Sequence, residues 1–204
     1  VTAIAAPASL ILKLEGEGGH AGAMLMPLRR DVLAAAAEIV LEVERAALST
    51  ESEDSVATVG RILNHPNNIN AVPSSLELGL DIRDIDALRR DGMVAQILEA
   101  AHEICTRRQI ALEVGWLNQD PPARSGEWVL EAARAACVEL GIHPREMVSR
   151  AYHDSLFMAR VCPIAMIFIP CFKGYSHRPD EFSSETDIGR GVDVLARALL
   201  KLAQ

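Results

Sequence analysis

The sequence lacks the features that would place the protein in a membrane or on a nucleic acid. No run of about 18 apolar residues occurs, because Pro163 and Pro170 interrupt the apolar stretch between Cys162 and Cys171. Basic residues are also outnumbered, since 20 lysines and arginines stand against 28 aspartates and glutamates, for a formal net charge of −8. A surface that binds phosphate backbones needs a basic excess. We therefore expect neither a membrane span nor a nucleic-acid partner.

Several motifs of known catalytic and binding sites are also missing. The four cysteines, Cys105, Cys137, Cys162 and Cys171, include no Cys-x-x-Cys pair. We therefore expect no cysteine-ligated zinc site and interpret the cysteines as reduced structural residues. There is no Gly-x-x-x-x-Gly-Lys phosphate loop, no Gly-x-Ser-x-Gly nucleophile elbow and no His-Glu-x-x-His zinc motif. The chain opens on Val1 without a signal-type segment, and Val1 need not be a natural start.

The composition that remains is that of a chain with a sizeable core. Its 204 residues are 50% hydrophobic and 24% charged, enough for one large domain or two small ones. Over residues 1–117, segments with the alternation typical of strands are separated by segments with helical spacing. We predict strands at 10–14, 56–63, 76–82 and 110–116, and helices at 32–43 and 85–107. The order βαββαβ predicts a ferredoxin-like unit.

Residues 118–204 have a different character. The segment Asn118–Pro122 carries two prolines and predicts a linker or crossover. Beyond it we predict helices at 127–140, 156–160 and from about 187, strands at 147–149 and 164–169, and Gly141 as a helix C-cap. So few strands cannot complete a doubly wound sheet, and we expect part of an α/β domain whose remainder lies elsewhere. Because strand 164–169 would lack its neighbours, we predict that the chain folds poorly by itself.

Histidines are the main candidates for chemistry. Three of them have structural explanations, at turns or on an exposed helix face: His65, His102 and His143. His177 follows the apolar strand 164–169, and ligands of α/β sheets gather where strands end. It is either a metal ligand, with Asp180 or Glu181 orienting its second nitrogen, or a hydrogen-bonded structural histidine.

His20 and His153 complete the set. His20 lies in Glu15-Gly-Glu-Gly-Gly-His-Ala-Gly22. The four glycines indicate either a flexible or tightly turned loop that presents an imidazole, or a plain strand-to-helix turn. His153 lies next to Asp154 in the C-terminal segment. One histidine of metal-ligand type cannot make a catalytic site, which needs about three protein ligands. Either the protein is not a metalloenzyme or the other ligands lie outside this sequence.

Four groups of residues carry a family resemblance. They are Gly18–Gly22 with Met26–Asp31, Pro66–Pro73 with Leu80–Asp84, Ser149–Ser155, and Met166–Cys171 with Gly174–Glu181. In order and spacing, over nearly the whole chain, they resemble the amidohydrolase and carbamoylase branch of the aminoacylase and carboxypeptidase-type dinuclear metallohydrolases. The form Ser-Arg-Ala-Tyr-His-Asp-Ser departs from the Ser-Gly-Ala-Gly-His-Asp-Ala of allantoate and N-carbamoyl-amino-acid hydrolases. With Pro-Cys-Phe-Lys-Gly-Tyr-Ser-His, it is most similar to plant-type ureidoglycolate amidohydrolases.

The resemblance implies a protein with both α+β and α/β parts. Residues 1–117 would be a ferredoxin-like lid that also makes a homodimer. Residues 118–204 would be the C-terminal portion of an α/β catalytic domain whose N-terminal portion is absent. Two divalent metal ions, Mn²⁺ or Zn²⁺, are implied, with His177 as the one ligand in this chain and the general base upstream. The compartment would be the cytoplasm for a bacterial protein and the endoplasmic reticulum for a plant-like one.

The resemblance also implies roles for five further residues. His20 would reach into the partner subunit's site and stabilise charge on a tetrahedral intermediate. Asn70 and Arg83 would bind the substrate carboxylate, a task that suits a guanidinium. Tyr152 and His153 would line the substrate pocket. The metals would activate a bridging water and polarise the ureido carbonyl.

The implied reaction is hydrolysis of the ureido C–N bond of a small ureido acid. Ureidoglycolate as substrate would give glyoxylate, ammonia and carbon dioxide. Allantoate or an N-carbamoyl-L-amino acid is the alternative substrate. A third interpretation, from another class, is an inactive dimerisation and substrate-lid module, or a family member whose upstream site has degenerated and only binds.

Overall fold

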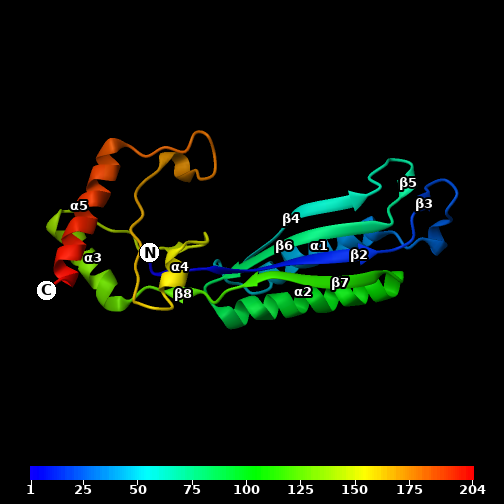
Figure 1. Cartoon of the computed structure of the whole chain (residues 1–204), viewed down its shortest axis with the longest axis horizontal. Helices are drawn as coiled ribbons and strands as arrows, with labels where there is room; N and C mark the ends of the chain where they lie inside the picture. Colours follow the sequence, from blue (N-terminus) through cyan, green and yellow to red (C-terminus); the bar gives the residue numbers. More distant parts are fainter. The chain divides into compact units, whose positions relative to one another are not determined.

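The structure, a computed structural model, describes residues 1–204 and divides them into two compact units (Figure 1). One unit runs from Ala5 to Pro122, and we call it the ferredoxin-like unit. The other, the C-terminal unit, combines Val1–Ile4 with Ala123–Gln204. These bounds differ from the expected division at residues 117 and 118. The first four residues belong with the C-terminal unit, and residues 118–122 belong with the ferredoxin-like unit.

The ferredoxin-like unit contains a four-stranded sheet and two helices. In chain order its main elements are β2 (Ala6–Glu15), α1 (Val32–Leu48), β4 (Val56–His65), β6 (Ser75–Asp84), α2 (Ala87–Arg108) and β7 (Ala111–Gln119). The strands are ordered β4-β6-β2-β7 across the sheet, and every neighbouring pair is antiparallel. This is the split-βαβ topology. The predicted βαββαβ order is confirmed.

One face of this sheet is buried. Leu10, Leu12 and Leu14 on β2 are fully buried, while Lys13 between them is exposed. All ten residues of β6 alternate in the same way, and helix residues such as Ile39 pack in the same cluster. Burial of one such side chain contributes about 1.5–3 kcal/mol. The two-residue period of the sequence therefore reports a sheet with one face in a core.

Both helices begin at an aspartate that caps them. Asp31 Oδ1 accepts hydrogen bonds from the main-chain N–H groups of Leu33 and Ala34, at 3.0 and 3.2 Å. Asp86 Oδ1 accepts one from the N–H of Arg89, also at 3.0 Å. Such caps satisfy donors that have no partner inside the helix. They fix the residue at which each helix starts after its strand.

A buried carboxylate lies at the end of the sheet where the chain enters and leaves the unit. Asp84 is fully buried and accepts hydrogen bonds from Ser55 Oγ at 2.5 Å and from Arg89 Nε at 2.8 Å. The main-chain N–H of Asp86 donates to the same carboxylate at 2.8 Å. These bonds tie the start of β4, the end of β6 and the start of α2 to one charged group.

Arg90 is a second buried charge at this end. It is 2% exposed, and its guanidinium donates to the main-chain carbonyls of Ala6 and Asp120 and to the Asp91 carboxylate. Ala6 begins the first strand of the unit and Asp120 follows the last one. Arg90 therefore joins the incoming and outgoing segments of the unit.

Two loop segments lie at the opposite end of the sheet, and we call residues 16–31 and 66–74 the distal loops (Figure 1). They contain β3 (Gly19–His20), which pairs antiparallel with β5 (Ala71–Val72), and the short helix η1 (Met26–Leu28). A Cβ on Gly18 would lie 2.8 Å from Ser74 Cβ, so no larger residue fits there without a shift. The glycine-rich segment is therefore closely packed against the second loop.

The C-terminal unit has a small sheet and two longer helices. Its strands are ordered β8 (Ala123–Arg124), β1 (Ala3–Ile4) and β9 (Val148–Ser149), with β1 antiparallel to β8 and parallel to β9. Helices α3 (Glu127–Glu139) and α5 (Glu185–Leu202) pack together around a buried cluster of Ala136, Cys137, Val194 and Ala198. Two short helices, α4 (Ser155–Met158) and η2 (Phe172–Gly174), lie between them in sequence.

The end of α3 confirms the predicted glycine cap. Gly141 has a φ of +68° and donates to Val138 O at 3.0 Å, and Ile142 N donates to Cys137 O at 2.9 Å. This pair of bonds is a Schellman motif, which needs a left-handed residue at its centre.

The prediction of a strand at 164–169 is wrong for this structure. The main chain there makes two bonds to other segments: Ile164 O accepts from Gly126 N at 2.8 Å, and Met166 O accepts from the Val1 ammonium at 2.9 Å. A strand needs a continuous ladder to a neighbour. The three strands of this unit are two residues each, and none runs alongside 164–169.

All four cysteines are free, in agreement with their interpretation as thiols. Cys105 and Cys137 are buried, and burial raises the pKa of both thiols. Cys162 is exposed and Cys171 is half-buried. No helix is long and apolar enough to cross a membrane.

Candidate functional site

His20 and Asn70 lie side by side in the distal loops. The pairing of β3 with β5 places His20 opposite Ala71, and the N–H of Ala21 donates to Asn70 O at 2.8 Å. Both His20 and Asn70 are exposed. The structure therefore brings together two predicted site residues that are far apart in the sequence.

The turn after His20 holds its imidazole. The main-chain N–H of Gly22 donates to His20 Nδ1 at 3.1 Å. The carbonyl of His20 accepts from the N–H groups of Ala23 and Met24, at 3.0 and 3.1 Å. The ring is thus fixed from its Nδ1 side. Of the two alternatives left open by the sequence, a tight turn that presents an imidazole describes this segment.

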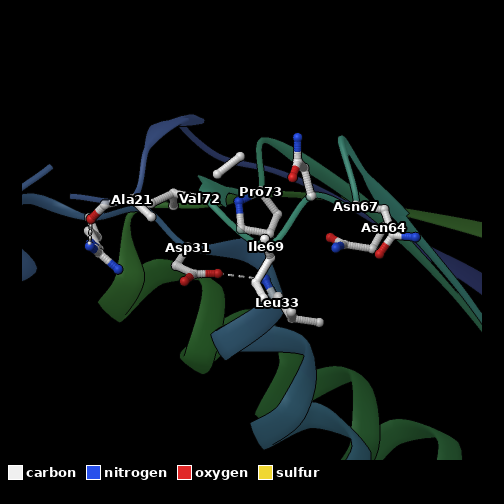
Figure 2. A pocket seen from close by; sticks show the side chains of 11 residues that line it. Ala21, Asp31, Leu33, Asn64, Asn67, Ile69, Val72 and Pro73 are labelled. Atoms are coloured by element: carbon white, nitrogen blue, oxygen red, sulfur yellow. Dashed lines mark hydrogen bonds between the residues drawn. The ribbon is translucent and has the colours of Figure 1, made fainter. Parts of the chain in front are cut away.

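A hollow of about 520 Å³ opens beside the distal loops (Figure 2). Its polar lining consists of Asn64, Asn67 and Asn68 with Arg29 and Asp31. Asn64 Oδ1 is buried and has no hydrogen-bond partner. An unpaired buried acceptor costs free energy, so a donor from a water or a ligand would be favourable there.

The asparagines of this hollow were not among the predicted site residues. The available signal was the run Asn64-His-Pro-Asn-Asn-Ile-Asn70, in which four asparagines surround a turn. Asparagine is common in turns for local structural reasons, so composition alone does not distinguish a turn from a lining of amides.

Arg83 is paired within its own strand. Its Nε and Nη2 donate to the two carboxylate oxygens of Asp81 at 2.6 and 3.0 Å. This hydrogen bonding raises the pKa of the Arg83 guanidinium against the opposing effect of burial. The bidentate pair orients the guanidinium, which is partly buried.

Arg83 does not lie near Asn70 within one copy of the chain. It pairs with Pro7 at one end of the sheet, whereas Ser75, the first residue of β6, pairs with Glu15 at the other. Arg83 lies eight residues after Ser75 along β6, a distance of about 26 Å at the usual rise per residue. Asn70 lies beyond Ser75, in the distal loops. One small carboxylate cannot contact both side chains of the same copy.

His153 and Tyr152 have aromatic neighbours in the C-terminal unit. Ser149 Oγ, which belongs to a residue only 3% exposed, hydrogen-bonds to His153 Nε2 at 2.7 Å. The His153 ring also lies 5.7 Å from the Phe168 ring, and the Tyr152 ring meets Phe157 edge-on at 5.6 Å. These contacts fix the His153 imidazole and leave Tyr152 exposed.

His177 occupies an exposed turn with a left-handed φ of 58°. Its main-chain N–H donates to Glu181 Oε2 at 3.0 Å. Arg178 donates to both carboxylate oxygens of Asp180, at 2.8 and 2.9 Å, and stacks on the Tyr175 ring at 3.8 Å. The role of Asp180 or Glu181 in orienting the His177 ring stays a prediction. Both carboxylates hold other groups, because the turn brings main-chain and guanidinium donors closer to them.

The residues present do not fit a two-metal centre by themselves. No group of three or more His, Cys, Asp or Glu side chains is arranged to hold a metal ion. His177 is the one predicted ligand, and a catalytic metal site needs about three from the protein.

The chain combines a ferredoxin-like unit with a small mixed unit of short strands and helices, and comparison with known protein families shows its class. The model of peptidase family M20/M25/M40 matches residues 8–201. The chain belongs to this family, whose members are metal-dependent hydrolases.

Comparison with curated proteins narrows the relationship. The chain is 52% identical to the ureidoglycolate hydrolase of Arabidopsis thaliana, over 100% of this chain and 43% of that protein. It is 50% identical to the ureidoglycolate hydrolase of Oryza sativa subsp. japonica, over 100% of the chain and 42% of that protein. An N-carbamoyl-L-amino acid amidohydrolase of Geobacillus stearothermophilus is 38% identical, over 100% of the chain and 49% of that protein. The chain thus spans about half the length of its relatives.

Comparison with solved structures supports the same family relationship. AtUAH in complex with (S)-hydroxyglycine matches with a TM-score of 0.91 at 52% identity, covering 98% of this chain and 48% of that one. A hydantoinase/carbamoylase family amidase from Burkholderia multivorans matches with a TM-score of 0.90 at 30% identity, with the same coverage. The resemblance inferred from the four sequence segments is confirmed.

Proposed function

We propose that the intact protein containing this chain hydrolyses the ureido C–N bond of ureidoglycolate and releases glyoxylate, ammonia and carbon dioxide. Identities of 52% and 50% to two plant ureidoglycolate hydrolases support this substrate over the alternatives. AtUAH has also been crystallised with glyoxylate and with (S)-hydroxyglycine. The observation that carries the assignment within this structure is the pairing of the two loops that present His20 and Asn70.

Each predicted residue receives a role in this proposal. His20 donates a hydrogen bond to the oxygen on which charge develops, and such a donor favours the transition state. Arg83 binds the carboxylate and Asn70 assists with its amide. Tyr152 and His153 line the pocket, and His177 is one ligand of a pair of divalent ions, Mn²⁺ in the first instance. The other ligands would come from sequence outside these 204 residues.

We further infer that a working site takes residues from two copies of the protein. About 26 Å of strand separates Arg83 from the start of the distal loops, so the His20 and Asn70 of one copy cannot share a small substrate with its own Arg83. A symmetric dimer whose ferredoxin-like units run antiparallel would place the distal loops of each copy at the Arg83 end of the other. The separation of Arg83 from the distal loops supports such a homodimer through the ferredoxin-like unit.

Ammonia release tests the substrate. The intact protein, loaded with Mn²⁺, is incubated separately with ureidoglycolate, allantoate and an N-carbamoyl-L-amino acid. We expect turnover of ureidoglycolate at least tenfold faster than of the other two, which corresponds to about 1.4 kcal/mol of discrimination. Faster turnover of allantoate or the carbamoyl amino acid would contradict the proposed substrate and show that the protein acts on that compound instead. That runner-up has support of its own, because relatives of both names match nearly the full chain.

A non-enzymatic role is the second class to be tested. The absence of a three-ligand cluster favours a lid and dimerisation module if the intact protein also lacks the other ligands. Calorimetric titration of the intact protein with Mn²⁺ separates the two cases. Two bound ions per copy and turnover are expected, and no tight binding together with no turnover would establish the module.

A further inference from the structure

We propose that Gly22 is a positioning residue that selects the tautomer of His20. Its main-chain N–H donates to His20 Nδ1 at 3.1 Å. A neutral imidazole has one N–H and one bare nitrogen. A nitrogen that accepts a hydrogen bond must be the bare one, so the proton of the neutral ring is on Nε2.

The consequence is a ring with a defined donor. Nε2 has no partner within the chain and His20 is exposed, so the Nε2–H is available to an incoming oxygen. In the opposite tautomer Nε2 would be a bare acceptor and would repel a developing negative charge. This inference rests on the proposed function only for the use of the donor. The choice of tautomer is a property of the chain alone.

Packing explains why residue 22 is a glycine. A Cβ at this position would lie 3.3 Å from His20 Cε1 and 3.4 Å from His20 Nδ1. The approach to Cε1 is slightly tighter than ordinary van der Waals contact and the approach to Nδ1 lies at its limit, so the imidazole would have to shift by a few tenths of an ångström. Glycine therefore allows the N–H to approach the ring and leaves the ring in place.

Asn70 is linked to the same arrangement. The N–H of Ala21 donates to Asn70 O at 2.8 Å, so the residue between His20 and Gly22 is bonded to the second loop. The turn that fixes the His20 tautomer is thereby held beside Asn70. A change at Gly22 is expected to act on His20 directly and on Asn70 only through this bond.

The tautomer can be measured in the intact protein by ¹⁵N NMR of labelled histidine at mildly alkaline pH. Protonated and bare ring nitrogens have distinct ¹⁵N shifts and different couplings to the ring protons. We expect His20 to be entirely in the Nε2–H form. Gly22→Pro, which removes the N–H, is expected to give a mixture of both forms. Unchanged signals from the other five histidines of this chain show that the variant is folded.

Two variants separate the lost donor from added bulk. Gly22→Ala keeps the N–H and adds a Cβ, so it is expected to keep the Nε2–H form and to shift the His20 signals. Gly92→Ala is the matched control, because a Cβ on Gly92 in α2 meets nothing within 4 Å. An Nδ1–H form in the unaltered chain would overturn the proposal. So would identical His20 signals in the unaltered chain and a folded Gly22→Pro variant.

Kinetics of the intact enzyme test the use of the donor. Gly22→Pro is expected to lower kcat about tenfold or more with a smaller change in KM, since a transition-state donor is affected. If His20→Ala leaves kcat unchanged, the catalytic role of His20 fails while the tautomer result stands. If His20→Ala abolishes turnover and Gly22→Pro does not, the positioning role is overturned and the proposed function stands.

Discussion

The two units of this chain differ in how they bury their apolar residues. In the ferredoxin-like unit, both helices and the sheet share one cluster of 21 buried residues. In the C-terminal unit, α3 and α5 share a cluster of four. On α5, Ile188, Val192, Leu195 and Leu199 are 46–59% exposed.

This difference in burial indicates which apolar residues contribute to the stability of each unit. Ile188, Val192, Leu195 and Leu199 fall on one stripe of α5, at spacings of three and four residues. A stripe of this kind is normally buried, and exposed apolar stripes mark surfaces that need a partner. The ferredoxin-like unit closes its own core, whereas the C-terminal unit leaves the apolar stripe of α5 exposed.

The largest effect is expected from a core substitution in the ferredoxin-like unit. Leu78 is fully buried on the central strand β6, so Leu78→Ala should lower the free energy of unfolding by about 2–5 kcal/mol. Leu195→Ala, on the exposed stripe of α5, is the matched control and should cost less than about 0.5 kcal/mol. The two tryptophans, Trp116 in β7 and Trp128 in α3, allow urea unfolding of each unit to be followed separately. Equal losses would remove the contrast between the units.

Asp84→Asn should cause the next largest loss in the free energy of unfolding. The carboxylate accepts bonds from Ser55, Arg89 and the main chain of Asp86, and it is fully buried. Replacing a charged acceptor by an amide weakens these bonds and should cost about 1.5–3 kcal/mol. Urea unfolding followed by Trp116 fluorescence measures the loss. A shift of the Trp128 transition instead would contradict the assignment of this cluster to the ferredoxin-like unit.

The pH dependence of stability should follow the same residue. Burial alone raises the pKa of Asp84, but the bonds from Arg89, Ser55 and Asp86 outweigh it, and the pKa lies below its ordinary 3.8. A carboxyl whose pKa falls on folding stabilises the folded state above its unfolded pKa, and this contribution is lost as the pH drops. The ferredoxin-like unit should therefore weaken below about pH 4. In Asp84→Asn the unfolding midpoint should change less over this range, and an unaltered slope would argue against Asp84.

The smallest effect is expected in the C-terminal unit. Arg134 donates to Glu127 and Glu146 at 2.5 and 2.6 Å, on the surface, and these bonds raise its pKa. Exposed ion pairs contribute little because water and salt screen them. Arg134→Ala should leave the Trp128 unfolding transition within experimental error, at low and at high salt. A clear loss that disappears in salt would show that this pair is stronger than its exposure suggests.

Elements that bury one face could be predicted from the sequence, because their apolar residues recur with a fixed period. Interactions that leave no such periodic pattern could not be predicted. The alternation Leu76–Ile82 predicted β6 because the core covers one side of that strand. Strand 164–169 was predicted from apolar content alone, and such a run cannot reveal whether a neighbouring strand is present.

The candidate site was only partly predictable for the same reason. The motifs around His20 and Asn70 were recognisable, but β3 and β5 are two residues long, so no pattern predicted their pairing. The separation of Asn70 from Arg83 follows from the sheet register, which is a property of the folded chain. The hydrogen bond from Gly22 to His20 depends on a turn geometry that glycine permits and does not specify.

We propose that one working site takes His20 and Asn70 from one copy and Arg83 from another. The most direct test of this proposal is the activity of mixed dimers of the intact protein, co-expressed with two tags and purified through both. Dimers of His20→Ala with Arg83→Ala should contain one complete site and recover about half of the wild-type rate per dimer. Dimers of His20→Ala with Asn70→Ala should have no activity, because the distal loops at each site then carry one of the two substitutions. Activity in the second mixture, or none in the first, would contradict the account.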